Sequence, residues 1–346
     1  MRQFRIITKA RVNRSATSVA LVCSLVALSG CSNDGVFVGR ATDLPEVATP
    51  SPTTTPAVPT HAGVGRIYAI KVGGVTRTYR LHLPLSGPTG PRPLVIALHA
   101  GGSSAKALTG ESGLDGAGDR SGVVVAYPQG VRGFWNNGLP GNLARTNAAA
   151  DVAFVGALIQ DASTHTRIDQ KRVVVAGIGD GAIMALRIAA DAPQLVTGAV
   201  AIEGGLVDAT GAPRPREPIS VLFIRATSDP SLPYTGSGEG SSQGPQLGAN
   251  ESADVFRAIN GLGGSPTESD VRVSDRDPAD GARTFRTRWL RGARGTSVTL
   301  YRIEGAGGAW PGGTGESARS GSIGSLTRDF SAASIAIQFA LETRRP

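Results

Sequence analysis

The sequence is poor in cysteine, and both of its cysteines lie near its beginning. Cys23 falls within the apolar run Val19–Leu28, and Cys31 follows that run closely. If the segment before Cys31 is removed on export and Cys31 is modified, no thiol remains for a disulfide or a metal site. No group of cysteine, histidine and carboxylate residues has metal-ligand spacing, and no glycine motif has the lysine or the βαβ context of a phosphate loop. We therefore expect neither a metal nor another cofactor.

The chain also lacks a bilayer-spanning run at its N-terminus, because Val19–Leu28 is too short to cross a membrane comfortably. Basic residues precede this run and the small residues Ser29 and Gly30 follow it, so residues 1–30 are predicted to be a signal peptide. Leu28-Ser29-Gly30-Cys31 resembles the bacterial lipobox, whose cysteine receives diacylglycerol and becomes the mature N-terminus. We expect an exported protein, anchored by lipid on the outer face of the cell membrane. The alternative is an ordinary secretory signal, which would release the protein.

A strong net charge is absent once the signal peptide is set aside. The formal charge is +8, but five of the 35 basic residues lie within the first 14 positions, leaving 30 against 27 acidic residues. This balance gives no reason to expect a nucleic-acid partner. After Cys31, residues 31–63 are rich in proline and threonine and have almost nothing apolar to bury, which predicts an extended tether. The folded domain is expected over residues 64–346.

Short apolar runs and helical patterns alternate along this domain. Arg66–Val72 and Thr76–Leu83, on either side of Gly73-Gly74, predict a β-hairpin. Continuous apolar runs predict parallel strands covered on both faces at Leu94–Leu98, Val123–Tyr127, Val173–Ala176, Ala199–Ile202 and Val221–Ile224. Helices are expected at Asp151–Ser163, with Asp151 as its cap, at Glu251–Ile259 and at Ala332–Leu341, and further strands at Thr284–Leu290 and Ser297–Ile303. Thr235–Gly248 shows no periodicity. The pattern predicts an α/β fold, a doubly wound and mostly parallel sheet with an N-terminal antiparallel hairpin.

Arg172–Arg187 is the stretch around which this domain is organised, because it predicts a strand, a tight turn and a helix in direct succession. The turn is Gly177-Ile178-Gly179-Asp180-Gly181. In α/β-hydrolases the corresponding turn is G-x-S-x-G, whose serine stands above the sheet at the N-terminus of the helix. Gly179 occupies the serine position and has no atom that could attack a carbonyl.

Other motifs surround this turn along the chain. They are Thr78–Pro84, Leu98–Gly102, Val125–Gln129, Trp135, Asp151-Val152, Ile168-Asp169, Arg172-Val173, Asp229-Pro230, Pro233-Tyr234, Asn260-Gly261 and Trp310–Gly313. In this order they resemble the polyhydroxybutyrate-depolymerase and feruloyl-esterase-like group of secreted α/β-hydrolases, which includes actinobacterial lipoproteins. The resemblance covers about Tyr68 to Leu341 and implies the α/β-hydrolase fold, an esterase ancestry and a Ser-His-Asp triad.

The triad implied by this resemblance is incomplete. The family's serine falls on Gly179 and its histidine, two residues before Trp310, falls on Gly308, so that only the acid matches, at Asp229. In this fold the histidine follows the acid along the chain. The four histidines are His61, His82, His99 and His165, and none follows Asp229. The triad chemistry is therefore expected to be absent.

The remaining candidates surround the old active site. His99, Ala100 and Gly101 resemble the family's H-G-x-G oxyanion loop, with Ala100 in place of its first glycine. We expect this loop and the helix start at Asp180 to direct backbone donors to one place, and Trp135 and Trp310 to flank it, although packing in the core is an equal reading for both tryptophans. His99 is expected to be structural, and His82 and His165 to lie at surface or capping positions. Asp180 as a carboxylate nucleophile would put Ile178 where the turn needs a small residue.

Three functions remain open. The first is a lipid-anchored, disabled esterase-family protein that binds an acyl, ester or sugar-bearing ligand in the old cleft. The second is an active carboxylic ester hydrolase with an unrecognised constellation, and the third is a purely structural envelope lipoprotein. Ester turnover separates the first two, and ligand binding separates the third. The sequence names no partner protein and no oligomeric state.

Overall fold

The computed structural model describes residues 63–87, 89–140, 150–241, 244–314 and 325–346. The predicted signal peptide, Cys31 and the tether lie outside these residues, except for Gly63. All of the described residues belong to one compact unit, Pro56–Pro346. Within the described part of the chain, no helix combines the length and the apolar character that crossing a bilayer requires.

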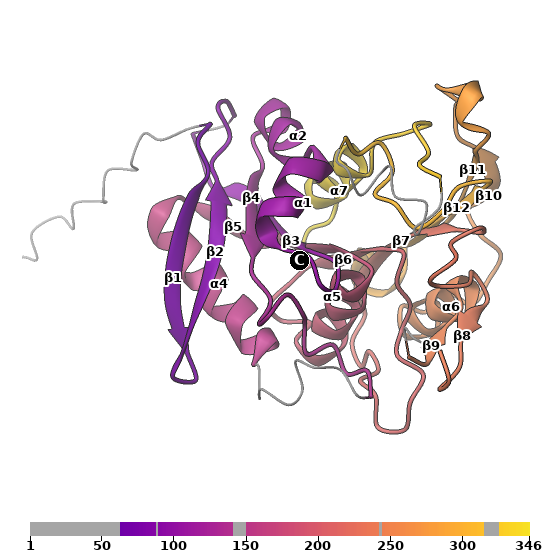
Figure 1. Cartoon of the computed structure of the whole chain (residues 1–346), viewed down its shortest axis with the longest axis horizontal. Coiled ribbons are helices and arrows are strands. Elements are labelled where there is room, and N and C mark those ends of the chain that lie inside the picture. The colour runs from indigo at the N-terminus through magenta and orange to yellow at the C-terminus, as the bar shows by residue number, and fades with distance from the viewer. Residues whose placement is uncertain (1–62, 88, 141–149, 242–243, 315–324) are drawn as a thin grey trace, which may run out of the picture. The chain divides into compact units, whose positions relative to one another are not determined.

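The centre of this unit is a ten-stranded sheet with the strand order β1-β2-β4-β3-β5-β6-β7-β12-β11-β10 (Figure 1). Its strands are β1 Arg66–Val72, β2 Val75–His82, β3 Arg92–Leu98, β4 Val124–Pro128, β5 Ile168–Ile178, β6 Gly198–Ile202, β7 Ser220–Ala226, β10 Glu268–Arg272, β11 Arg283–Trp289 and β12 Val298–Glu304. The strands from β4 to β12 in this order are parallel, whereas β1, β2, β10 and β11 pair antiparallel. A separate two-stranded sheet joins β8 Gly236–Ser237 to β9 Gln246–Leu247. The predicted doubly wound sheet with an N-terminal antiparallel hairpin is confirmed.

Helices cover both faces of the large sheet. On one face lie α1 Ala105–Ser112, α2 Leu114–Ser121 and α7 Ala332–Glu342, and on the other α4 Asp151–His165, α5 Asp180–Asp191 and α6 Ala249–Ile259 (Figure 1). Successive residues of a strand point to opposite faces. Val95 therefore packs in the core beneath α1, α2 and α7, and Ile96 packs in the core beneath α4, α5 and α6. This is why the central strands are continuous apolar runs in the sequence.

Two details differ from the sequence-based expectation. Asp151 does not cap α4, whose N-cap position is Ala150 without a side-chain bond. Its buried carboxylate instead accepts hydrogen bonds from Arg77 Nη2 and the Asn136 backbone N–H, each at 2.7 Å, because a buried charge needs a charged partner more than the helix needs a cap. β10 was not predicted, since its exposed, charged residues show no apolar alternation.

The two outlying histidines also differ from each other. His82 is not a surface residue: only 2% of it is exposed, and its Nε2 lies 2.9 Å from Asp119 Oδ1, because α2 covers this part of β2. His165 does lie at the end of α4, where its ring stacks on Tyr68 with 3.9 Å between centroids. Each of these histidines thus contacts an aspartate or an aromatic ring outside the elbow.

Candidate active site at the turn between β5 and α5

The turn after β5 has the backbone geometry of a nucleophile elbow. Gly179 joins β5 to α5 as a single residue with φ 55° and ψ −118°. Its N–H donates to Ile202 O at 2.9 Å, and its carbonyl accepts from Ala182 N and Ile183 N at 3.0 and 3.1 Å. A positive φ of this kind costs a non-glycine residue about 1–3 kcal/mol. The tight turn that the sequence predicted is therefore present, with glycine at its strained position.

The positions that flank Gly179, at Gly177 and Gly181, must be glycine for a steric reason. A Cβ on Gly177 would lie 2.2 Å from Gly181 O, and a Cβ on Gly181 would lie 2.3 Å from Leu98 O, both far inside contact distance. A Cβ on Gly179 would meet only Ala100 Cβ, at 3.7 Å. The flanking glycines let strand and helix approach, whereas position 179 has room for a side chain.

The His99-Ala100-Gly101 loop lies against the start of α5. A Cβ on Gly101 would come 3.2 Å from Asp180 Cβ, so the loop and the first helical turn meet. His99 is fully buried; its Nδ1–H donates to Ala100 O at 2.8 Å, and its Nε2 accepts from Gly130 N at 3.0 Å. Burial also lowers the pKa of His99, which keeps the ring neutral. With both ring nitrogens engaged, His99 holds the loop and cannot serve as a base toward position 179.

The Asp180 carboxylate faces the segment after β4. It accepts hydrogen bonds from the Trp135 backbone N–H at 3.0 Å and from the Asn137 side-chain amide. A carboxylate at a helix N-terminus is stabilised by the helix dipole. It also places negative charge beside the position where an ester oxyanion would develop, which opposes the stabilisation that an oxyanion hole provides.

The two tryptophans do not form the walls of an open cleft. Trp135 is fully buried and its Nε1–H donates to His99 O at 2.8 Å, so the residue supports the loop from inside. Trp310 is 5% exposed and packs in the core beneath α7, near Phe330. The hypothesis that Trp135 and Trp310 flank a ligand is therefore wrong, because the core uses both rings.

The acid position and the base position are adjacent. Asp229 is 8% exposed, and its Oδ1 accepts from Ser231 N at 2.7 Å and Leu232 N at 3.1 Å. A Cβ on Gly308 would lie 2.6 Å from Asp229 Oδ2. The structure thus brings these two sequence positions together, but the carboxylate occupies the space that a side chain at position 308 would need.

A buried ion pair beside this acid was not anticipated from the sequence. Glu203 follows β6 with φ 48°, its Oε1 accepts from Ala226 N at 2.9 Å, and its Oε2 lies 3.6 Å from Arg225 Nε. Burial raises the pKa of Glu203 to about 8, although the charge of Arg225 opposes the rise. The positions of Glu203 and Arg225 in the sequence could have indicated this pair. Each residue directly follows a predicted apolar strand, at the carboxyl ends of the strands where the elbow also lies. Among the described residues no group of three or more potential ligands could hold a metal ion.

Comparison with known proteins finds similarity to esterases. Residues 77–231 match the family model described as "Esterase PHB depolymerase". "Putative esterase NocK" of Nocardia uniformis subsp. tsuyamanensis is 29% identical over 351 residues, which cover 95% of this chain and 98% of that protein. "Probable feruloyl esterase C" of Aspergillus niger is 27% identical over 46% of this chain and 57% of its own length, and "Poly(3-hydroxyalkanoate) depolymerase C" of Paucimonas lemoignei is 33% identical over 36% and 30%.

Esterases are among the solved structures that the chain matches at low identity. An acetyl xylan esterase from Aspergillus awamori is 14% identical with a TM-score of 0.46, covering 69% of this chain and 93% of that chain. The strand order from β1 to β12 and the elbow after β5 are those of an α/β-hydrolase. Over residues 77–231 the chain thus matches the polyhydroxybutyrate-depolymerase family, and it is similar along its length to proteins named as esterases and, in part, as feruloyl esterases.

Proposed function

We propose that this chain is a disabled member of the esterase family, which binds an ester, acyl or sugar-bearing ligand at the elbow without cleaving it. One observation carries the proposal: Gly179 stands at the apex of the elbow and Gly308 stands against Asp229. A triad needs a nucleophile at the first position and a base at the second. In the well-studied proteases the loss of one such group costs about six orders of magnitude in turnover.

The described histidines offer no replacement base. His99 is committed to the loop, and His82 and His165 lie beside Asp119 and Asp161. A Cβ at position 308 would lie 2.6 Å from Asp229 Oδ2, so a restored histidine requires this carboxylate oxygen to move.

Binding is supported by what the elbow retains. The loop at Gly101 still meets the first turn of α5, and we expect backbone N–H groups of the loop and of the helix N-terminus to face an acyl oxygen there. Asp180 and Asp229 put carboxylates near the same place, which disfavours an anionic ligand. An uncharged ester, acyl or sugar-bearing ligand best fits a site that combines backbone N–H donors with two nearby carboxylates.

Ester hydrolysis by the purified chain is the direct test. With short aryl esters and polyhydroxyalkanoate we expect no turnover above background, and no labelling by a serine-directed fluorophosphonate. A turnover of a few per second, close to the roughly ten per second of ordinary enzymes, would favour the alternative of an active hydrolase with an unrecognised constellation.

Restoring the triad sharpens this test. Gly179→Ser and Gly308→His are each expected to stay inactive, because triad members act as a unit. If the double variant gains activity, that activity should require Asp229. Activity in Gly179→Ser alone would reveal a base that acts in place of position 308.

Ligand binding is tested by calorimetric titration with acylated sugars, envelope glycolipid fragments and hydroxycinnamoyl esters. We expect heat with at least one of them, little changed by salt, because the ligand is uncharged. No heat with any of them would favour the purely structural lipoprotein.

We also propose that the protein is exported and held on the outer face of the membrane by lipid at Cys31. The proposal rests on the lipobox-like Leu28-Ser29-Gly30-Cys31 sequence. Cys31→Ala should abolish acyl labelling and either release the protein from the membrane fraction or leave it with an uncleaved signal. Unchanged acyl labelling in this variant would contradict the proposal.

A further inference from the structure

A cavity of about 780 Å³ opens at the edge of the sheet opposite the elbow. It is lined by the segments that precede β6, β7 and β12 and by the end of α7, whereas Gly179 and Asp229 follow the carboxyl ends of β5 and β7. β7 alone separates the two edges by about 20 Å at the usual rise per residue. The cavity is therefore a different place from the proposed triad site.

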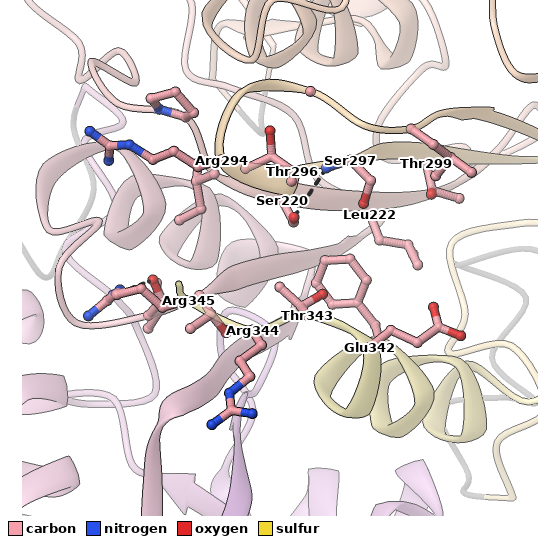
Figure 2. Close-up of a pocket in the computed structure, with 18 of the residues that line it drawn as sticks. Ser220, Leu222, Arg294, Thr296, Ser297, Thr299, Glu342, Thr343, Arg344 and Arg345 are labelled. Atoms are coloured by element: carbon pink, nitrogen blue, oxygen red, sulfur yellow. Dashed lines mark hydrogen bonds between the residues drawn. The ribbon is translucent and has the colours of Figure 1, made fainter.

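The cavity is lined by apolar and hydroxyl-bearing side chains together. Figure 2 shows Ser220, Leu222 and Thr299 on one side and Thr343 with Glu342, at the end of α7, on the other. Leu222, Thr299 and Arg288 are direct cross-strand neighbours on β7, β12 and β11, so their side chains point to the same face. Ile335 and Phe339 of α7 face them across the cavity. A ligand here meets hydrocarbon and hydroxyl groups together.

Arginine dominates the charge around the cavity. Six of its lining residues are arginines, at positions 286, 288, 291, 294, 344 and 345, against two glutamates, Glu217 and Glu342. Arg286 and Arg288 share one carboxylate, that of Glu268, at 2.7 and 3.2 Å. Arg294 is paired with Glu217 at 2.8 Å. The excess of positive charge therefore comes from the other arginines.

Three arginines keep their charge uncompensated. Arg345 donates to the carbonyl oxygens of Pro193 and Val196 at 2.8 and 3.0 Å, which positions its guanidinium without neutralising it. Arg291 and Arg344 have no hydrogen-bond or ion-pair partner among the residues that the structure describes. Guanidinium groups bind carboxylate and phosphate oxygens in pairs of parallel hydrogen bonds.

We propose that this arginine-rimmed cavity binds a small amphipathic anion, with an apolar body against Leu222 and Phe339 and an oxyanion head near Arg291 and Arg344. The volume lies within the range of about 300–1,000 Å³ that is usual for small-molecule sites. Apolar wall and cationic rim occur together, so neither a bare inorganic anion nor a neutral hydrocarbon uses the whole cavity. The head is a carboxylate or a phosphate, and the cavity would act independently of the elbow.

Calorimetric titration of the full chain in zwitterionic nanodiscs, with empty discs as the blank, tests the proposal. The probes are 4-phenylbutyrate and phenyl phosphate, with the neutral 4-phenylbutanol and inorganic phosphate as the two half-ligands. We expect at least one of the two complete probes to bind, and both half-ligands to bind at least tenfold more weakly. Binding of 4-phenylbutyrate alone identifies a carboxylate head and binding of phenyl phosphate alone a phosphate head.

Variants locate the binding. The double variant Arg291→Gln/Arg344→Gln should weaken the complete probe at least tenfold, because it loses charge-assisted hydrogen bonds. Arg276→Gln removes an exposed arginine outside the cavity and should change nothing. Ser297→Trp, which fills the cavity but keeps every arginine, should also abolish binding. Failure of both complete probes to bind, or equal binding in the wild type and the double variant, would overturn the proposal.

Discussion

The carboxyl ends and the amino ends of the parallel strands form two edges of the sheet, here called the carboxyl edge and the amino edge. These two edges differ in how their charged residues are buried and paired. At the carboxyl edge Arg225 is 0% exposed, Glu203 3% and Asp229 8%, and each has a fixed hydrogen-bond partner. At the amino edge the arginines are half-buried or exposed, and several lack a carboxylate of their own. Buried charges must be paired to be tolerated, whereas exposed charges remain available to a ligand. The charged groups at the carboxyl edge are thus already engaged within the protein, whereas several arginines at the amino edge remain open to a ligand.

Breaking the buried pair should give the largest effect. Arg225→Met is expected to lower the free energy of unfolding by about 3 kcal/mol at pH 9, where Glu203 is mostly ionised in the wild type and would lose its buried cation. The matched change at the other edge, Arg288→Met, should cost no more than about 1 kcal/mol, since Arg288 is only half-buried. Denaturant unfolding of both variants measures the difference. Equal losses would remove the contrast between the two edges.

The pH dependence of stability should depend on Glu203. Its pKa is raised from 4.5 to about 8 in the folded protein, so the folded state binds the extra proton between these values. Stability from this group is therefore present below about pH 4.5 and is lost as pH rises through 8. Relative to Glu203→Gln, the wild type should lose about 3 kcal/mol between pH 5 and pH 8. Unfolding at both pH values measures this, and the contribution of His99 cancels because both proteins contain it.

The two buried tryptophans offer a matched comparison of a ring with a hydrogen bond and a ring without one. Trp135→Phe should cost about 1–2 kcal/mol, because His99 O loses its donor. Trp310→Phe should cost less, because no described residue accepts a hydrogen bond from Trp310 Nε1. Thermal unfolding compares them. A larger loss for Trp310→Phe would show that its packing, and not hydrogen bonding, decides the order.

The smallest effect is expected at the elbow itself. Gly179→Ser should lower stability by about 1 kcal/mol, from the positive φ alone, because the added side chain has room. Gly73→Ala is the matched control, with φ 56° and nothing within 4 Å of the added Cβ. Similar losses would show that the strain is purely in the backbone. A stabilised Gly179→Ser would show that the turn is not strained.

The amino-acid sequence predicted the sheet better than the site. The three valines of Val173–Ala176 and the glycines after them fixed both the strand and the turn, since local apolar runs and glycine spacing are local properties. The ion pair Glu203–Arg225 was not predicted, because its partners are 22 residues apart and meet only when β6 and β7 align. The placement of Trp135 and Trp310 was wrong, because a sequence shows that a ring is large and apolar but not which side of a loop covers it.

By itself the sequence determined that positions 179 and 308 carry no reactive group, because a glycine has no side chain in any fold. It also determined most of the strands and helices, through periodicity that each segment carries alone. Only the tertiary structure decided that the Asp229 carboxylate fills the space beside Gly308 and that distant arginines gather around a cavity at the other edge. Both depend on which strands lie next to each other in the sheet, and that is set by packing between segments far apart in the chain.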